Sequence, residues 1–71
     1  MEIRRQFGLN IKKLRKAAGI SQEDLADRSG IARSYMSDCE RGARNTSIEI
    51  AAKIAVGLGL PVARLFDEID D

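Results

Sequence analysis

Residues 21–42 read SQEDLADRSGIARSYMSDCERG, and this stretch decides the fold. Apolar or small side chains recur through it at helical spacings, interrupted once at Ser29-Gly30, a turn dipeptide that ends a helix. Ser21 can begin the first helix by accepting a hydrogen bond from a backbone amide two or three residues later. Gly42 can follow the second helix, because glycine tolerates the left-handed conformation common there. The stretch therefore predicts two short helices that meet steeply around one buried corner, a helix-turn-helix.

The second of these helices, expected from about residue 32 to residue 42, has two unlike faces. Each residue turns the helix by about 100°, which groups four side chains on an inward face: Met36, Cys39, Glu40 and Ala32. The opposite face is small, polar and able to hydrogen-bond, and it comprises Ser34, Ser37, Asp38 and Arg41, flanked by Arg33 and Tyr35. The helix alone does not decide whether this outward face is merely solvated or binds a partner.

Length and composition limit the classes of protein that fit. A chain of 71 residues, 44% hydrophobic and 32% charged, suits one small globular domain, residues 1–71, built as a bundle with short loops. Histidine is absent and there is one cysteine, so we expect no enzyme, no metal and no cofactor. No apolar run approaches the roughly 18 residues of a membrane span, and the charged N-terminus is unlike a signal peptide. We therefore expect a cytoplasmic protein with no membrane partner.

The formal net charge of +1 is unevenly distributed along the chain. Residues 1–45 carry ten basic and six acidic side chains, whereas residues 46–71 carry two basic and five acidic ones. Positive charge thus accompanies the helix-turn-helix, as a surface that faces phosphates requires. A chance asymmetry of a few charges is the alternative interpretation.

Three further helices are expected around this pair. The first, residues 2–18, ends at Gly19. The fourth begins at residues 46–49, a capping box in which the Thr46 hydroxyl bonds the Glu49 amide, and runs to about Gly57. Its inward stripe comprises Ile48, Ala51, Ile54, Ala55 and Leu58. Pro61 suits the first position of a fifth, short helix.

These residues together resemble the phage repressor/Cro-like helix-turn-helix family. The resemblance spans nearly the whole chain and rests on Gly8, Leu14-Arg15, Gly19 to Glu23, Leu25-Ala26, Ser29 to Ile31, Ser37, Glu40 to Gly42, Ile54-Ala55 and Leu58. Residues 33–35 and 40–45 resemble, more narrowly, the controller proteins of restriction-modification systems. Many family members have proline where Thr46 stands, but a capping box serves the same helix start. The resemblance implies an all-α, compact five-helix bundle, a lambda repressor-like DNA-binding domain.

The resemblance further implies that the third helix enters the major groove of double-stranded operator DNA. The positions that match base contacts in the family are Arg33, Ser34, Tyr35, Ser37 and Asp38. The positions that match phosphate contacts are Gln22, Arg41, Arg44 and Asn45. Arg33 is the first candidate to read guanine, because its fork can bond O6 and N7 together, although a phosphate contact is almost as good an interpretation. Asp38 could accept a hydrogen bond from cytosine N4, repel wrong bases, or orient Arg33 or Arg41.

Two other positions are interpreted as structural. Arg15 and Glu40 match positions that pair in the family, so an ion pair is expected to tie the first helix to the end of the third. An unpaired Glu40 carboxylate on the inward side would be costly. Cys39 is interpreted as a small core residue in preference to a redox switch, because it lacks a basic neighbour.

The family forms homodimers through its last helices, so residues of about 46–69 are expected to dimerise. The candidate interface residues are Ile50, Val56, Leu60, Val62, Phe66 and Ile69. Ile50 and Val56 lie off the inward stripe of the fourth helix, but which of the six are core and which are interface stays open. A dimer places two recognition helices about 34 Å apart, one turn of DNA, so the operator should be an inverted repeat.

The sequence therefore predicts a homodimeric, sequence-specific transcriptional regulator, and more narrowly a restriction-modification controller. The alternatives are a phage-type or antitoxin-like repressor and a helical protein-interaction module that uses the apolar fourth and fifth helices. RNA polymerase is a further candidate partner. Activation and repression differ in where the operator lies relative to a promoter, which a protein sequence does not record.

Overall fold

The computed structural model describes residues 2–68, which form helices joined by short loops. The elements, in chain order, are α1 (Ile3–Ala17), α2 (Gln22–Ser29), α3 (Arg33–Glu40), α4 (Ile48–Leu58) and η1 (Val62–Phe66). The all-α prediction and the order of five elements are confirmed, and the last element is a short 3-10 helix. None of the helices in the described range is long and apolar enough to cross a membrane.

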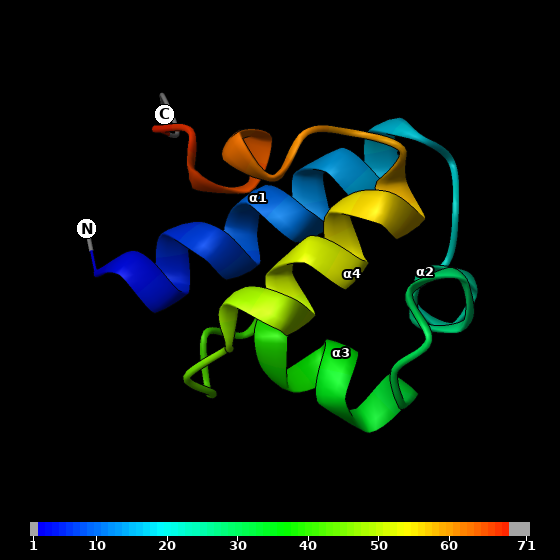
Figure 1. Cartoon of the computed structure of the whole chain (residues 1–71), viewed down its shortest axis with the longest axis horizontal. Coiled ribbons are helices and arrows are strands. Elements are labelled where there is room, and N and C mark those ends of the chain that lie inside the picture. The colour runs from blue at the N-terminus through cyan, green and yellow to red at the C-terminus, as the bar shows by residue number, and fades with distance from the viewer. Residues whose placement is uncertain (1, 69–71) are drawn as a thin grey trace.

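The helix pair of residues 21–42 forms where the sequence predicts it. Ser21 Oγ accepts a hydrogen bond from the Asp24 amide nitrogen at 3.0 Å, and Gly30 ends α2 with φ of +70°. Gly42 also has φ of +70°, two residues after α3 ends. Figure 1 shows α2 end-on while α3 runs across the view, so the two axes cross steeply.

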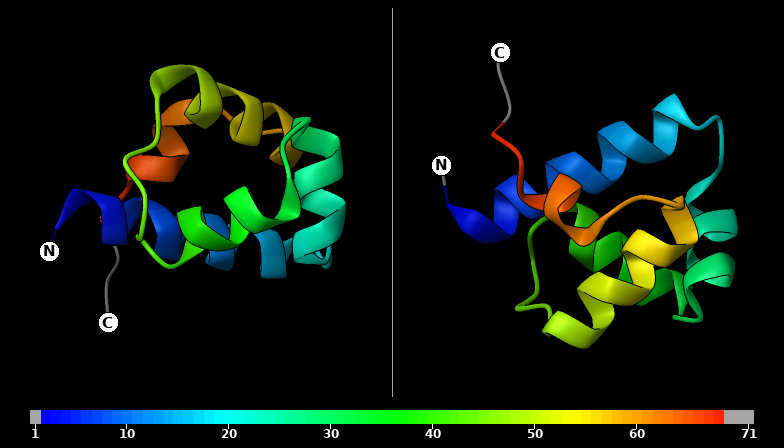
Figure 2. Two further views of the ribbon diagram at one scale, coloured as in Figure 1. Left: turned by 90° about the horizontal axis from the view of Figure 1, so that it is seen from below. Right: turned by 45° about the horizontal axis from the view of Figure 1, so that its top comes forward.

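A single core joins the five elements. Five large side chains are fully buried, one from each element: Ile11, Leu25, Met36, Ile54 and Leu65. α3 packs against α1 and α2, whereas η1 packs against α1 and α4. Seen from below in Figure 2, α3 lies on the near side of the molecule and η1 on the far side. The core therefore holds α3 by its inward side and leaves its outward face uncovered by the other helices.

The segment that carries η1 is anchored to α1 by two amide side chains. Asn10 Nδ2, which is buried, donates hydrogen bonds to the Leu65 carbonyl at 2.9 Å and the Asp67 carbonyl at 2.7 Å. Gln6 Nε2 donates to the Phe66 carbonyl at 2.8 Å. These bonds satisfy carbonyl groups that a short 3-10 helix leaves unpaired at its end.

α1 and α3 approach each other closely at Gly8. A Cβ atom on Gly8 would lie 2.4 Å from the carbonyl oxygen of Cys39 and 2.6 Å from that of Glu40. Backbone atoms cannot swing aside as a side chain can. Gly8 therefore allows the middle of α1 to rest directly on the last turn of α3.

The predicted boundaries of α4 need correction at both ends. The cap is Ser47, whose Oγ accepts a hydrogen bond from the Ile50 amide at 3.2 Å, and Thr46 instead has its hydroxyl 3.4 Å from Cys39 Sγ. The helix then continues through Gly57 and ends at Gly59, which has φ of +70°. Gly57 lies inside the helix at a point where α4 packs closely on α2: a Cβ there would lie 2.4 Å from Ser29 Oγ.

The inward stripe of α4 differs from the prediction at its N-terminal end. Ile48, expected in the core, is 87% exposed, while Ile50, expected off the stripe, is partly buried against the core. Ala51, Ile54 and Ala55 are buried as predicted. On α3 the inward prediction is wrong only for Ala32, which is exposed because it precedes the first turn.

Candidate nucleic-acid interface

Gln22 and Arg33 lie at the starts of the two helices of the pair. Gln22 is the first residue of α2 and is half-buried. Arg33 is the first residue of α3, and its Nη1 lies 3.7 Å from Glu23 Oε2. The Arg33 and Glu23 side chains are both mostly exposed, so the attraction between them is weak. Arg33 is therefore free to move toward a partner.

On the outward face of α3, Ser34 is exposed and Ser37 is partly exposed. Neither hydroxyl contributes to the hydrophobic core. Hydroxyl groups can donate to and accept from base edges, and small side chains let the helix backbone approach closely. Together with Arg33 they form a polar surface without large apolar groups.

A compact cluster of charges covers the C-terminal end of the same face. Arg41 Nη2 bonds Asp38 Oδ1, and Arg44 Nη2 bonds Asp38 Oδ2 at 2.9 Å. The Arg44 guanidinium also lies 4.2 Å from the centroid of the Tyr35 ring, a cation–π contact. Hydrogen bonds from Arg44 and then Arg41 hold the pKa of the Asp38 carboxyl below its usual value. Asn45, next along the loop, is exposed.

Arg15 and Glu40 form a bidentate ion pair behind this face. Arg15 Nε donates to Glu40 Oε2 at 2.7 Å and Arg15 Nη2 donates to Oε1 at 3.1 Å. Arg15 Nη1 also donates to the Ile20 carbonyl at 3.1 Å, and Glu40 is only 8% exposed. The pair ties α1 to the last residue of α3 and removes the carboxylate from the outward face.

Cys39 lies on the inward side of α3, where it is 1% exposed. Burial raises the pKa of its thiol, which makes the reactive thiolate scarce at neutral pH. Among residues 2–68 there is no group of three His, Cys, Asp or Glu side chains placed to hold a metal ion. In this structure Cys39 fills space in the core beside Thr46.

The six candidate interface residues fall into different environments. Val56, Val62 and Phe66 are exposed, while Ile50 and Leu60 are partly buried. Ile69 lies outside the described residues.

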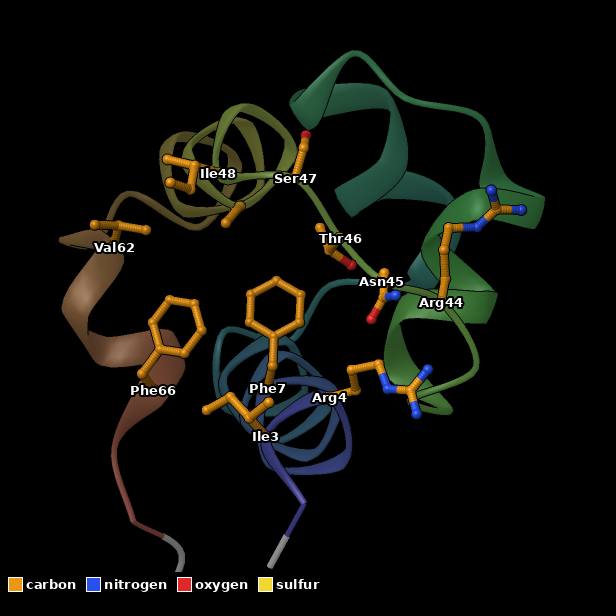
Figure 3. A pocket seen from close by; sticks show the side chains of 11 residues that line it. Ile3, Arg4, Phe7, Arg44, Asn45, Thr46, Ser47, Ile48, Val62 and Phe66 are labelled. Atoms are coloured by element: carbon orange, nitrogen blue, oxygen red, sulfur yellow. The ribbon is translucent and has the colours of Figure 1, made fainter.

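Two exposed apolar side chains, Ile3 and Ile48, were not among those six. With Val62 and Phe66 they line a cavity of about 290 Å³ between α1, α4 and η1, shown in Figure 3. At the back of this cavity the Phe7 and Phe66 rings stack with their centroids 5.2 Å apart. The Ser47 cap was the signal that could have identified Ile48, because a first-turn residue projects away from the core.

The geometry defines a class of protein. A steeply crossed helix pair is held by a shared core, and the second helix presents a polar face flanked by arginines, as in proteins that insert this helix into the major groove of DNA. The chain belongs to the helix-turn-helix family, whose model matches residues 11–65.

Individual relatives are similar over much of this chain. The control protein C.MunI of a Mycoplasma species is 40% identical over 70 residues, 97% of this chain and 95% of that protein. The transcriptional regulator SinR of Bacillus subtilis is 40% identical over 63 residues, 87% of this chain and 57% of SinR. The crystal structure of the restriction-modification controller protein C.AhdI from Aeromonas hydrophila matches with a TM-score of 0.86 and 43% identity, over 89% of this chain and 96% of that one.

Proposed function

We propose that this protein is a sequence-specific DNA-binding transcriptional regulator of the restriction-modification controller type, which binds an inverted-repeat operator as a homodimer. The observation that carries the proposal is the outward face of α3: polar, free of core contacts, and bordered by Arg33 at one end and by Arg41 and Arg44 at the other. Similarity to C.MunI and C.AhdI over nearly the full length of each chain supports the controller type. The proposal includes no enzymatic activity.

The side chains of this face take different roles in the proposal. Arg33, Ser34 and Ser37 read base edges, because they lie exposed or half-exposed on the part of α3 that enters the groove. Phosphates are bound by Gln22 at the N-terminus of α2 and by the cationic and amide side chains that follow α3: Arg41, Arg44 and Asn45. Tyr35 supports Arg44 through its ring.

Replacing Arg33 with alanine is expected to weaken binding to a preferred sequence. That sequence would first be selected with the wild-type protein from a pool of random duplexes and then titrated in gel shifts. Loss of one bidentate guanine contact corresponds to about 1–3 kcal/mol, roughly 5- to 150-fold, for each half-site that the dimer occupies. The matched control is Arg64→Ala on η1, which removes the same charge on the side opposite α3.

The control should bind nearly as the wild type does. Equal affinities of the wild type and of the Arg33→Ala, Ser34→Ala double variant would mean that α3 does not read the sequence. Copurification of an unrelated protein, with no salt-dependent DNA binding, would instead favour a protein-interaction module.

The homodimer is proposed to form through the exposed apolar surface, defined as the exposed large hydrophobic side chains of residues 2–68: Ile3, Ile48, Val56, Val62 and Phe66. Four of them line one cavity, and Val56, which is 77% exposed, lies about two turns beyond Ile48 on α4 and about 80° further around the helix. Exposed apolar groups gathered in this way are typical of contact surfaces. The surface belongs to α1, α4 and η1, so α3 stays free for DNA.

Replacing Ile48 with glutamate is expected to raise the dimer dissociation constant at least tenfold, because a charge would be buried against apolar groups of the partner. Sedimentation over a range of protein concentrations measures this. The fold should survive, since residue 48 is exposed in the single chain. Ser34→Glu adds the same charge on α3 and should leave dimerisation unchanged. Wild-type sedimentation of Ile48→Glu would exclude this surface as the dimer contact.

A further inference from the structure

Asp38 engages the two arginines that follow it with both of its carboxylate oxygens. Oδ1 accepts from Arg41, and Oδ2 accepts from Arg44 at 2.9 Å. The Tyr35 ring lies under the Arg44 guanidinium and holds it beside the carboxylate. Arg33, at the other end of α3, has only a distant contact of 3.7 Å with Glu23. In the protein without DNA, the Arg41 and Arg44 guanidinium groups are therefore bound to Asp38. The Arg33 guanidinium, at the other end of α3, has no close partner of this kind among residues 2–68.

A carboxylate that bonds two guanidinium groups resembles a DNA phosphate in one respect: each presents a pair of anionic oxygens that accept hydrogen bonds from arginine. All three ionic side chains are partly or mostly exposed, so the cluster contributes little to folding stability. The effect of the cluster on DNA binding is larger than its effect on folding stability. Arg41 and Arg44 alone would bring a charge of +2 to the surface that faces phosphates. With the Asp38 carboxylate between them the net charge is +1.

We propose that Asp38 is an internal competitor for phosphate, which lowers the affinity of this protein for DNA of any sequence by occupying Arg41 and Arg44. The inference rests on the proposed function. It concerns the part of the DNA affinity that does not depend on base sequence, which the base-reading residues do not determine. Because phosphates are the same at every base pair, the effect is independent of sequence. Asp38 sets the baseline affinity, and Arg33 with the α3 hydroxyls adds discrimination on top of it.

The test is the salt dependence of binding by wild type and Asp38→Asn, which removes the charge and keeps the side-chain size. Binding to a mixed-sequence duplex and to the selected duplex is measured by fluorescence anisotropy at several salt concentrations. For each protomer of the dimer, one additional phosphate neutralised changes the slope of log affinity against log salt by about −0.9, which is about eightfold in affinity at 0.1 M salt relative to 1 M salt. Asp38→Asn should therefore bind both duplexes more tightly by the same several-fold factor, with a steeper slope.

The matched control is Asp67→Asn. Asp67 also pairs with an arginine, Arg64 Nε at 3.1 Å, but it directly follows η1, which packs against α1 and α4. Its replacement changes the net charge equally, and salt screens its effect on DNA at α3. A second measurement uses Arg44→Ala, which should cost more affinity in the Asp38→Asn background than in the wild type.

Each other outcome contradicts the proposal in a distinct way. Unchanged or weaker binding by Asp38→Asn would mean that the carboxylate does not compete, or that it positions the arginines productively. A change confined to one base position would assign Asp38 to cytosine N4 instead. If the wild-type protein binds no duplex at low salt, the proposed function fails and this inference fails with it. Far-UV circular dichroism confirms that the variants are folded.

Discussion

Gly8→Ala is expected to lower the melting temperature by about 8–16 °C, the equivalent of a net loss of about 2 kcal/mol. The added Cβ would lie 2.4 Å from the Cys39 carbonyl oxygen and 2.6 Å from that of Glu40, so α1 and α3 would have to separate. Overpacking of this kind costs about 3 kcal/mol, well above the roughly 1 kcal/mol gained from the better helix propensity of alanine. A loss of about 1 kcal/mol shifts the melting temperature of such a small domain by about 4–8 °C.

Thermal unfolding followed by circular dichroism measures the effect, and Gly19→Ala provides the comparison. Gly19 has φ of +72°, but a Cβ there would meet no atom within 4 Å. Its replacement should cost only the strain of the left-handed backbone, about 1–2 kcal/mol. If Gly8→Ala melts at the wild-type temperature or above Gly19→Ala, the two helices do not approach as closely as described.

Arg15→Met is expected to destabilise the fold by about 3–5 kcal/mol, because it leaves the Glu40 carboxylate buried without a partner. Chemical denaturation measures the loss of unfolding free energy. The double variant Arg15→Met, Glu40→Met should recover most of it, since replacing a buried ion pair with apolar side chains of similar size is often close to neutral. The Arg15–Glu40 pair thus affects stability mainly when one partner is removed and the other is left unpaired.

Arg64→Met breaks an exposed pair with Asp67 and should cost less than about 1 kcal/mol, which separates burial from charge pairing as the cause. A small effect of Arg15→Met, comparable to that of Arg64→Met, would show that water reaches Glu40 and that the pair does not fix the end of α3.

The sequence predicted most of the fold because its signals are local. Ser21, Gly30 and the spacing of apolar residues act within a few positions, and they define the helix pair correctly. The start of α4 was ambiguous, because Thr46 and Ser47 are adjacent and both can cap a helix. Because Ser47 is the cap, Ile48 is the first residue of α4 and lies exposed at the helix end, whereas Ala51, Ile54 and Ala55 keep the predicted inward face.

The site was less predictable where it depends on contacts between segments. The wheel of α3 grouped Asp38 and Arg41 correctly but could not show that the loop folds back and brings Arg44 to the same carboxylate. Nor could it show that Arg33 lies near Glu23, on another helix. The exposed apolar surface combines side chains far apart in the chain, such as Ile3 and Phe66, and no local pattern identifies such a combination.

The one-sided anchoring of α3 has a consequence for the evolution of this protein. Met36, Cys39 and Glu40 hold the helix from within, while residues 33, 34 and 37 support no core contact. Under the proposed function, substitutions at these outer positions change the preferred DNA sequence at little cost in folding stability. A lineage can therefore acquire a new operator through a few codon changes, while the scaffold that presents them stays the same.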